Sequence, residues 1–187
     1  MILEDFQLSG KNALVTGSSR GLGAAIAIAL AQAGANVGCH GRSTGGEATS
    51  KHIRQLGRKS FYLAGDMADS DFHSVLIDKT VKEFGSMDIL VNNAGAIRRA
   101  PAMEFPQNYW DELIAVNLTS VFRLSQLTAQ DIIRRGAKGK ILNIASILSF
   151  QGGITVPAYA AAKGGVASMT MSTSEWISFW NASNPTK

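Results

Sequence analysis

The octapeptide AYAAAKGG, residues 158–165, places a tyrosine four residues ahead of a lysine. On a helix, Tyr159 and Lys163 would face the same side. Reduction of a carbonyl group needs a proton donor close to the oxygen. A tyrosine, whose ordinary pKa is about 10, serves near neutral pH when a neighbouring cation favours its phenolate. The two residues are therefore a candidate acid/base pair, and a plain surface pair on an alanine-rich helix is the alternative interpretation.

A second chemical signal is the glycine-rich segment TGSSRGLG, residues 16–23, which follows the apolar run Asn12–Thr16 and precedes a helical pattern. A strand, a glycine-rich turn and a helix N-terminus form a phosphate cradle, because backbone N–H groups and the helix dipole both favour an anion. Gly17 permits the tight turn, Gly21 lets a phosphate approach the backbone, and Gly23 lets the helix pack on the strand. We predict a cofactor site here, with a purely structural turn as the alternative.

Short apolar runs alternate with longer helical patterns along the whole chain, which predicts an α/β fold with a doubly wound, Rossmann-type parallel sheet. We expect a single domain over residues 1–187. The predicted strands are Asn12–Thr16, Asn36–Gly41, Ser60–Ala64, Ile89–Asn92 and Lys140–Ile144. The predicted helices are Gly21–Ala33, Glu47–Leu56, Ser70–Phe84, a long region Asn108–Arg135, and one that begins near Pro157.

Charge and composition narrow the class of partner. Eighteen basic against fourteen acidic residues leave a net charge of +4, which suits an anionic ligand but is too small and scattered to predict nucleic-acid binding. The N-terminus lacks the pattern of a signal peptide, and no apolar stretch is long enough to span a membrane. The single cysteine, Cys39, gives neither a disulfide nor a metal-site spacing, so we expect a cytoplasmic protein without a metal site.

Several motifs together resemble the short-chain dehydrogenase/reductase family. The glycines follow a Gly-x-x-x-Gly-x-Gly spacing, and GDM (65–67) and NNAG (92–95) follow the third and fourth predicted strands. Ser146, Tyr159 and Lys163 have the family's spacings of thirteen and four residues, and Asn117 fits its catalytic-helix asparagine. The resemblance covers residues 8–170 and implies an NAD(P)-dependent oxidoreductase.

The resemblance also implies a role for each of four residues. Tyr159 would be the general acid/base, and Lys163 would favour the phenolate and hold the nicotinamide ribose. Ser146 would hydrogen-bond the substrate oxygen, and Asn117 would hold a water in a proton relay. Local caps and turns are the alternative roles of Ser146 and Asn117.

The remaining cofactor contacts follow from the same resemblance. Asp66 and Met67 would contact the adenine, and Asn93 would lie beside the ribose. Ser19 and Leu22 belong to the same glycine-rich loop and complete the expected contacts. Asp66 at a strand end could equally cap the next helix.

The end of the second predicted strand favours NADP(H) over NAD(H). An NAD-binding site would present an acid to the ribose 2′-hydroxyl there, whereas this chain has Arg42. Arg20 in the glycine-rich loop adds a second positive charge, and arginine pairs well with phosphate. NAD(H) stays the alternative, with both arginines merely solvated.

Two longer stretches, NNAGAIRRAPAMEF and ILNIASILSFQGGITVPAYAAAK, resemble sugar-acid dehydrogenases that act on 2-dehydro-3-deoxy-gluconate, 2-deoxy-gluconate or, more loosely, gluconate. We predict a sugar-acid substrate that contacts Ser146 and Gln151, with Arg98 or Arg99 binding its carboxylate. A 3-oxoacyl-thioester reductase is the alternative.

The chain departs from the family after the catalytic helix. Family members continue into further strands and a substrate lid, but residues 177–187 resemble neither, so we expect an atypical tail and a truncated or altered C-terminal part. A homo-oligomer is expected from the family, although the departure affects the surface on which family tetramers depend. The second hypothesis for function is therefore a catalytically weak nucleotide-binding remnant.

Overall fold

The computed structural model describes residues 6–173, and the predicted tail lies outside them. The strands are β1 (Asn12–Val15), β2 (Asn36–Gly41), β3 (Ser60–Ala64), β4 (Ile89–Asn92) and β5 (Lys140–Asn143). The helices are α1 (Gly21–Gln32), α2 (Ala48–Gln55), α3 (Ser70–Phe84), η2 (Ala102–Glu104), α4 (Gln107–Ile114), the π-helical turn η3 (Ala115–Thr119), α5 (Ser120–Arg134), α6 (Leu148–Gln151) and α7 (Pro157–Thr173).

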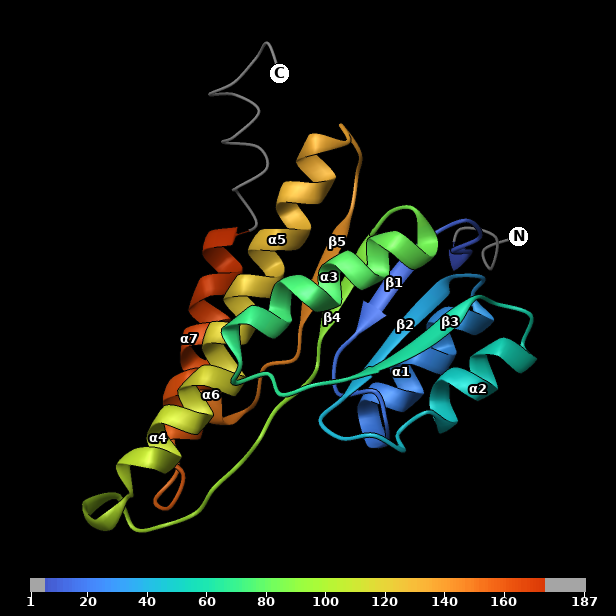
Figure 1. Ribbon diagram of the computed structural model, residues 1–187. Helices are drawn as coiled ribbons and strands as arrows, with labels where there is room; N and C mark the ends of the chain where they lie inside the picture. The colour runs from blue at the N-terminus through green and yellow to red at the C-terminus, as the bar shows by residue number, and fades with distance from the viewer. Residues whose placement is uncertain (1–5, 174–187) are drawn as a thin grey trace.

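The strands form one parallel sheet in the order β3-β2-β1-β4-β5, which confirms the predicted doubly wound fold. Helices α1 and α2 cover one face, and α3 and α5 pack against each other on the opposite face (Figure 1). The order of the strands reverses at β1, between β2 and β4. In such sheets a ligand binds outside the carboxyl ends of the strands at this switch point.

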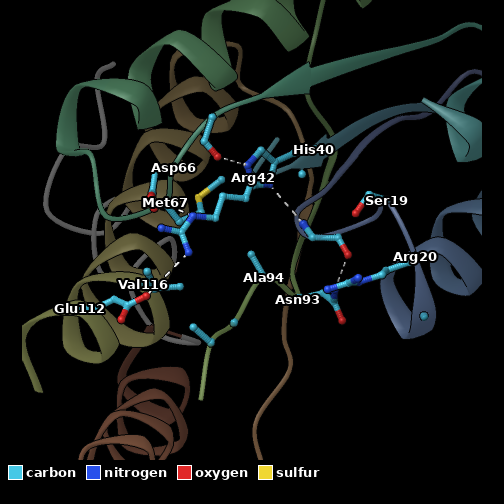
Figure 2. Close-up of a pocket in the computed structure, with 16 residues that line it drawn as sticks. Ser19, Arg20, His40, Arg42, Asp66, Met67, Asn93, Ala94, Glu112 and Val116 are labelled. Carbon is cyan, nitrogen blue, oxygen red and sulfur yellow. Dashed lines mark hydrogen bonds and ion pairs between the residues drawn. The ribbon is translucent and has the colours of Figure 1, made fainter. Parts of the chain in front are cut away.

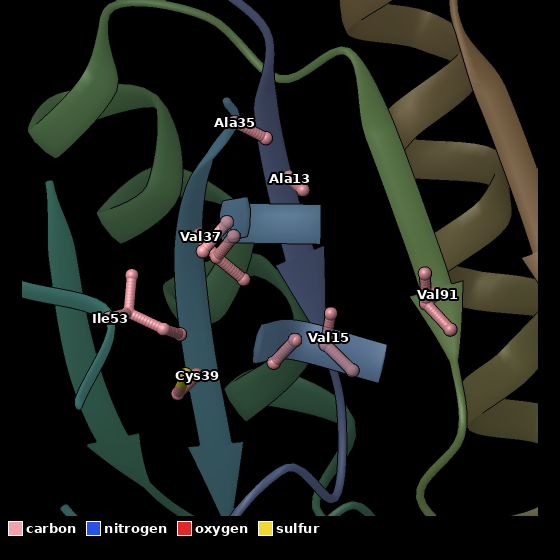
Figure 3. Packing of buried hydrophobic residues seen from close by; sticks show 9 residues of the cluster. Ala13, Val15, Ala35, Val37, Cys39, Ile53 and Val91 are labelled. Carbon is pink, nitrogen blue, oxygen red and sulfur yellow. The ribbon is translucent and has the colours of Figure 1, made fainter. Parts of the chain in front are cut away.

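Successive side chains of β1 belong to two different core clusters, one on each face of the sheet. Ala13 and Val15 belong to a cluster with α1, which Figure 3 shows together with Val37 and Cys39 of β2. Leu14, between them, belongs to the cluster with α3 and α5. Successive side chains of a strand point to opposite faces, so a strand buried on both sides is apolar throughout.

The predicted elements and the observed ones differ mainly in two places. The long helix predicted over Asn108–Arg135 is interrupted by the π-helical turn η3, and α6 lies in a segment with no predicted helix. The predicted helix start at Pro157 is confirmed. Within residues 6–173 no helix has the length and apolar character needed to cross a membrane.

Candidate active site

The predicted site residues follow the carboxyl ends of all five strands. The glycine-rich loop follows β1, Arg42 follows β2, Asp66 follows β3, Asn93 follows β4 and Ser146 follows β5. Parallel strands end at one edge of the sheet, so the topology brings these segments to the same side of the molecule.

Tyr159 and Lys163 lie one turn apart on α7. The Lys163 ammonium nitrogen lies 5.8 Å from the centroid of the Tyr159 ring and donates a hydrogen bond to the carbonyl of Ile144 at 2.5 Å. Lys163 is only 3% exposed, and this burial lowers its pKa. The acid/base prediction requires a lysine close to the tyrosine, and the two side chains lie together on α7, although burial works against the cationic form of Lys163.

Ser146 is fixed to α7 through a residue that the sequence analysis missed. The Ser146 hydroxyl accepts a hydrogen bond from the Leu148 N–H at 3.2 Å. The Ser149 hydroxyl accepts from the Ser146 N–H at 3.3 Å and donates to the Lys163 carbonyl at 2.9 Å. Ser149 therefore sets the position of the Ser146 turn relative to Lys163. Neither its residue type nor its spacing distinguishes Ser149 from other serines of the sequence.

Asn117 lies in the π-helical turn η3 and is fully buried. Its side-chain amide accepts from the Ala96 N–H and donates to the carbonyls of Ala96 and Leu113, each at 3.0 Å. These bonds join the segment after β4 to the interrupted helix. Such π-helical turns are frequent at functional sites.

A pocket of about 480 Å³ lies at the switch point of the sheet, between the loops that follow β1, β2, β3 and β4. Its lining contains these predicted cofactor contacts: Gly17, Ser19, Arg20, Gly21, Arg42, Asp66, Met67 and Asn93. Helix α1 begins at this pocket without a side-chain cap, so its first N–H groups are available to an anion.

Close backbone approach explains two of the loop glycines. Gly17 has φ +64°, in the left-handed region, and Gly23 packs so tightly that an added Cβ would lie 2.4 Å from the Gly17 carbonyl oxygen. The Asn93 amide donates to the carbonyls of Thr16 and Gly17, and the Thr16 hydroxyl accepts from the Asn93 N–H. The β1 and β4 loops therefore hold one another in place.

Arg42 lies between Asp66 and Glu112, as Figure 2 shows. Its guanidinium is 3.2 Å from the Asp66 carboxylate and 3.8 Å from that of Glu112, with 70% of the side chain exposed. Glu112 also accepts two hydrogen bonds from Arg98, at 3.0 and 2.9 Å, and Arg98 lies over the ring of Tyr109. The sequence analysis missed Glu112, since nothing along the chain marks the acid of α4 as a neighbour of the pocket.

The remaining predicted residues do not line the pocket. Leu22 is 59% exposed at the start of α1, and Gln151 is exposed at the end of α6. Arg99 is exposed, and within residues 6–173 it has no carboxylate partner, in contrast to Arg98. The catalytic pair connects to the pocket through α7, which packs against α4 and η3, the elements that supply Glu112 and Val116 to the lining.

Comparison with known proteins adds to this geometry. A family model described as short chain dehydrogenase matches residues 11–180. A 2-dehydro-3-deoxy-D-gluconate 5-dehydrogenase of Dickeya dadantii is 47% identical over 178 residues, which are 94% of this chain and 70% of that protein. A 3-oxoacyl-[acyl-carrier-protein] reductase of Staphylococcus aureus is 38% identical over 164 residues, which are 87% of this chain and 66% of that protein.

A solved structure resembles the chain in three dimensions. The crystal structure of a putative 2-deoxy-D-gluconate 3-dehydrogenase from Agrobacterium tumefaciens, with bound NADP, superposes with a TM-score of 0.81 at 45% identity. The match covers 91% of this chain and 68% of that one.

Proposed function

This chain belongs to the short-chain dehydrogenase family, and we propose that it is an NADP(H)-dependent oxidoreductase that interconverts a hydroxyl and a carbonyl group on a sugar acid of the 2-dehydro-3-deoxy-gluconate or gluconate type. One observation carries the proposal. The Tyr159–Lys163 pair lies on a helix packed against the wall of a pocket that has a glycine-rich, uncapped helix N-terminus on its other side.

The residues of this chain would carry out the proton chemistry. Tyr159 donates a proton from its hydroxyl to the carbonyl oxygen during reduction, and Ser146 donates a hydrogen bond to the same oxygen. Lys163, fixed by its bond to the Ile144 carbonyl, stabilises the phenolate that remains. The cofactor supplies the hydride. Asn117, whose amide is bound to Ala96 and Leu113, holds the segment that follows β4 against α4.

Arg20 and Arg42 support NADP(H) as the preferred cofactor, since both line the pocket and Arg42 occupies the position at which an acid would repel a 2′-phosphate. Among the described residues 6–173, Arg42 forms ion pairs with Asp66 and Glu112 in which its own side chain stays 70% exposed. Exposed pairs of this kind contribute little, so a 2′-phosphate can replace them.

Arg99 is the better candidate for the substrate carboxylate. Arg98 already donates two hydrogen bonds to the Glu112 carboxylate, whereas Arg99, in the segment that follows β4, is exposed. Ser146 and Gln151 would face the substrate from the other side. A 3-oxoacyl-thioester substrate is less well supported, because the reductase of that kind is 38% identical where the sugar-acid enzyme is 47% identical.

We further propose that the protein forms a homo-oligomer in the cytoplasm. Large apolar side chains are exposed near the end of β5 and on α6, among them Leu142 at 52% and Phe150 at 83%. Exposed apolar surface of this kind is typical of an association site. Light scattering after gel filtration tests the oligomer, and cell fractionation tests the location.

The decisive experiment combines binding and turnover. Calorimetric titration of the purified chain should give saturable binding that favours NADPH over NADH. Reduction of 2-dehydro-3-deoxy-gluconate should be lost in Tyr159→Phe, by about 10²–10⁴-fold, because general acid catalysis is removed. The variant should bind NADPH as before, and Arg99→Ala should raise KM. Binding without turnover would identify the chain as a catalytically weak nucleotide-binding remnant, and absence of binding to either cofactor would overturn its assignment as an enzyme. Preference for NADH would overturn the role of Arg42.

A further inference from the structure

His40, at the carboxyl end of β2, contacts two walls of the pocket through a single imidazole ring (Figure 2). Its Nδ1 accepts a hydrogen bond from the Gly17 N–H at 3.2 Å, and its Nε2 lies 3.0 Å from the carbonyl oxygen of Gly65. A carbonyl oxygen only accepts, so the proton resides on Nε2. The ring is therefore neutral, with an acceptor facing the glycine-rich loop and a donor facing the loop after β3.

The ring has little freedom to move. His40 is 2% exposed, and its ring packs against Phe72 with the centroids 5.6 Å apart. Its backbone is also tied to the glycine-rich loop, because the Ser18 N–H donates to the His40 carbonyl at 2.8 Å and the Ser18 hydroxyl accepts from the His40 N–H at 3.1 Å. The imidazole thus acts as a fixed spacer between the two loops.

A second buried histidine strengthens the same arrangement. His73 of α3 is 2% exposed, and its Nε2 lies 3.0 Å from the Met67 carbonyl. The loop after β3 therefore has the carbonyl before Asp66 bound by one histidine and the carbonyl after it bound by the other. Asp66 itself caps the following turn by accepting from the Ala68 N–H at 2.9 Å.

We propose that neutral His40 is a positioning residue for the cofactor, which holds the glycine-rich loop and the loop of residues 65–67 at the separation that binding requires, and that its protonation weakens cofactor binding. This inference rests on the proposed cofactor site. A protonated imidazole has only donors, so its Nδ1–H would oppose the Gly17 N–H. The bond to Gly65 would survive, whereas the bond to the glycine-rich loop would be lost.

Several charged groups surround His40. Burial lowers the pKa of His40 below the ordinary value of 6.5, while the bond to Gly65 and the carboxylate of Asp66 act in the opposite direction and His73 adds to the decrease. Of the other charged groups of the pocket, Arg42 is paired with Asp66 and Glu112, and Arg20 lies on the glycine-rich loop. Cofactor affinity should therefore be highest at neutral pH and decline only when the pH falls below 6.5.

The first test measures the dissociation constant of NADP⁺ by calorimetry from pH 8 to pH 5, for the wild type, His40→Asn and His52→Gln. Asparagine keeps an acceptor near the position of Nδ1 but cannot be protonated and cannot reach Gly65. We expect a three- to tenfold weaker affinity in His40→Asn at pH 8, about the effect of one hydrogen bond. As the pH falls, the wild type should approach the variant. His52, exposed on α2, is the matched control, and its variant should follow the wild type.

Taking the ratio of wild type to variant at each pH removes the titration of the ligand's own phosphates. A constant ratio from pH 8 to pH 5 would overturn the inference. Failure of the wild type to bind at pH 8 would instead overturn the proposed function, and this inference with it.

The second test uses only the wild type, so it does not depend on the folding of a variant. The chain has three histidines, so their ring signals are readily assigned by NMR. If binding requires neutral His40, saturation with NADP⁺ must lower its pKa. Simple attraction between the phosphates and an imidazolium would raise it. A decrease in the pKa supports the positioning role, and an increase or no change excludes it.

Discussion

At the scale of single residues, the site depends on polar side chains that bind backbone groups. Asn117, Thr16, Asn93 and His40 each bind main-chain atoms of another segment. A side chain of this kind fixes the loops that line the pocket relative to one another. Substitution of such a residue should therefore change geometry more than charge.

Ser149 gives the clearest prediction of this type. Ser149→Ala removes the bond to the Lys163 carbonyl and the acceptor for the Ser146 N–H. We expect kcat to fall about tenfold while the affinity for NADPH stays the same, because Ser146 is no longer held in position relative to Tyr159. Steady-state kinetics together with calorimetry separate the two effects.

Ser168→Ala is the control, since Ser168 is an exposed serine on α7. A purely structural role for Ser149 would lower the melting temperature of Ser149→Ala without changing kcat at a temperature where the variant is folded.

At the scale of elements, the contact between α7 and the π-helical turn η3 joins the catalytic helix to the pocket. The two helices approach closely where α7 has adjacent glycines. An added Cβ on Gly165 would lie 3.0 Å from a methyl group of Leu118, whereas one on Gly164 would meet only the Ser149 carbonyl, at an ordinary 3.5 Å.

This pair of glycines offers a matched comparison. Gly164→Ala should stabilise the protein by about 0.5–1 kcal/mol, because alanine is favoured over glycine inside a helix. Gly165→Ala gains the same helix propensity but must push α7 away from Leu118, so we expect no stabilisation and a lower kcat. Urea unfolding and turnover of both variants check this expectation. Equal stabilisation by both substitutions would show that Leu118 can accommodate the added methyl group.

At the scale of the whole molecule, an ion-pair network lies near the amino ends of β4 and β5, at the end of the sheet opposite the pocket. Arg135 donates to the Asp131 carboxylate at 2.8 Å and to the Met87 carbonyl at 2.6 Å, and lies 3.5 Å from Asp88. Asp88 in turn accepts from the Asn12 N–H of β1. The network connects α5 to the central strands, so it contributes to stability rather than to chemistry.

Arg135→Gln should lower the free energy of unfolding by about 1.5–3 kcal/mol at pH 7, since charge-assisted hydrogen bonds to a buried carboxylate are lost. Burial alone would raise the pKa of Asp131, but the hydrogen bonds from Arg134 and Arg135 outweigh it and lower the pKa below 3.8. The contribution is therefore present above pH 3.8 and lost as the pH falls through the lowered pKa.

The difference in the free energy of unfolding between wild type and Arg135→Gln should accordingly become smaller at acidic pH. Urea denaturation from pH 7 to pH 2.5 measures it, and the affinity for NADPH at pH 7 should be unchanged. A difference that stays constant across that range would show that packing by the arginine stem, not its charge, provides the stability.

The sequence by itself determined the order of strands and helices, the parallel sheet and the segments that form the site. Continuous apolar strands, glycine-rich turns and the Tyr159–Lys163 spacing are local patterns, and parallel strands always bring their carboxyl ends together. Only the tertiary structure decided which polar groups meet. Gly17 and His40 are 23 residues apart, and Arg98 and Glu112 are 14 residues apart. Such pairs depend on how loops and helices approach in space, because hydrogen bonds and ion pairs need distances of about 3 Å that no one-dimensional spacing encodes.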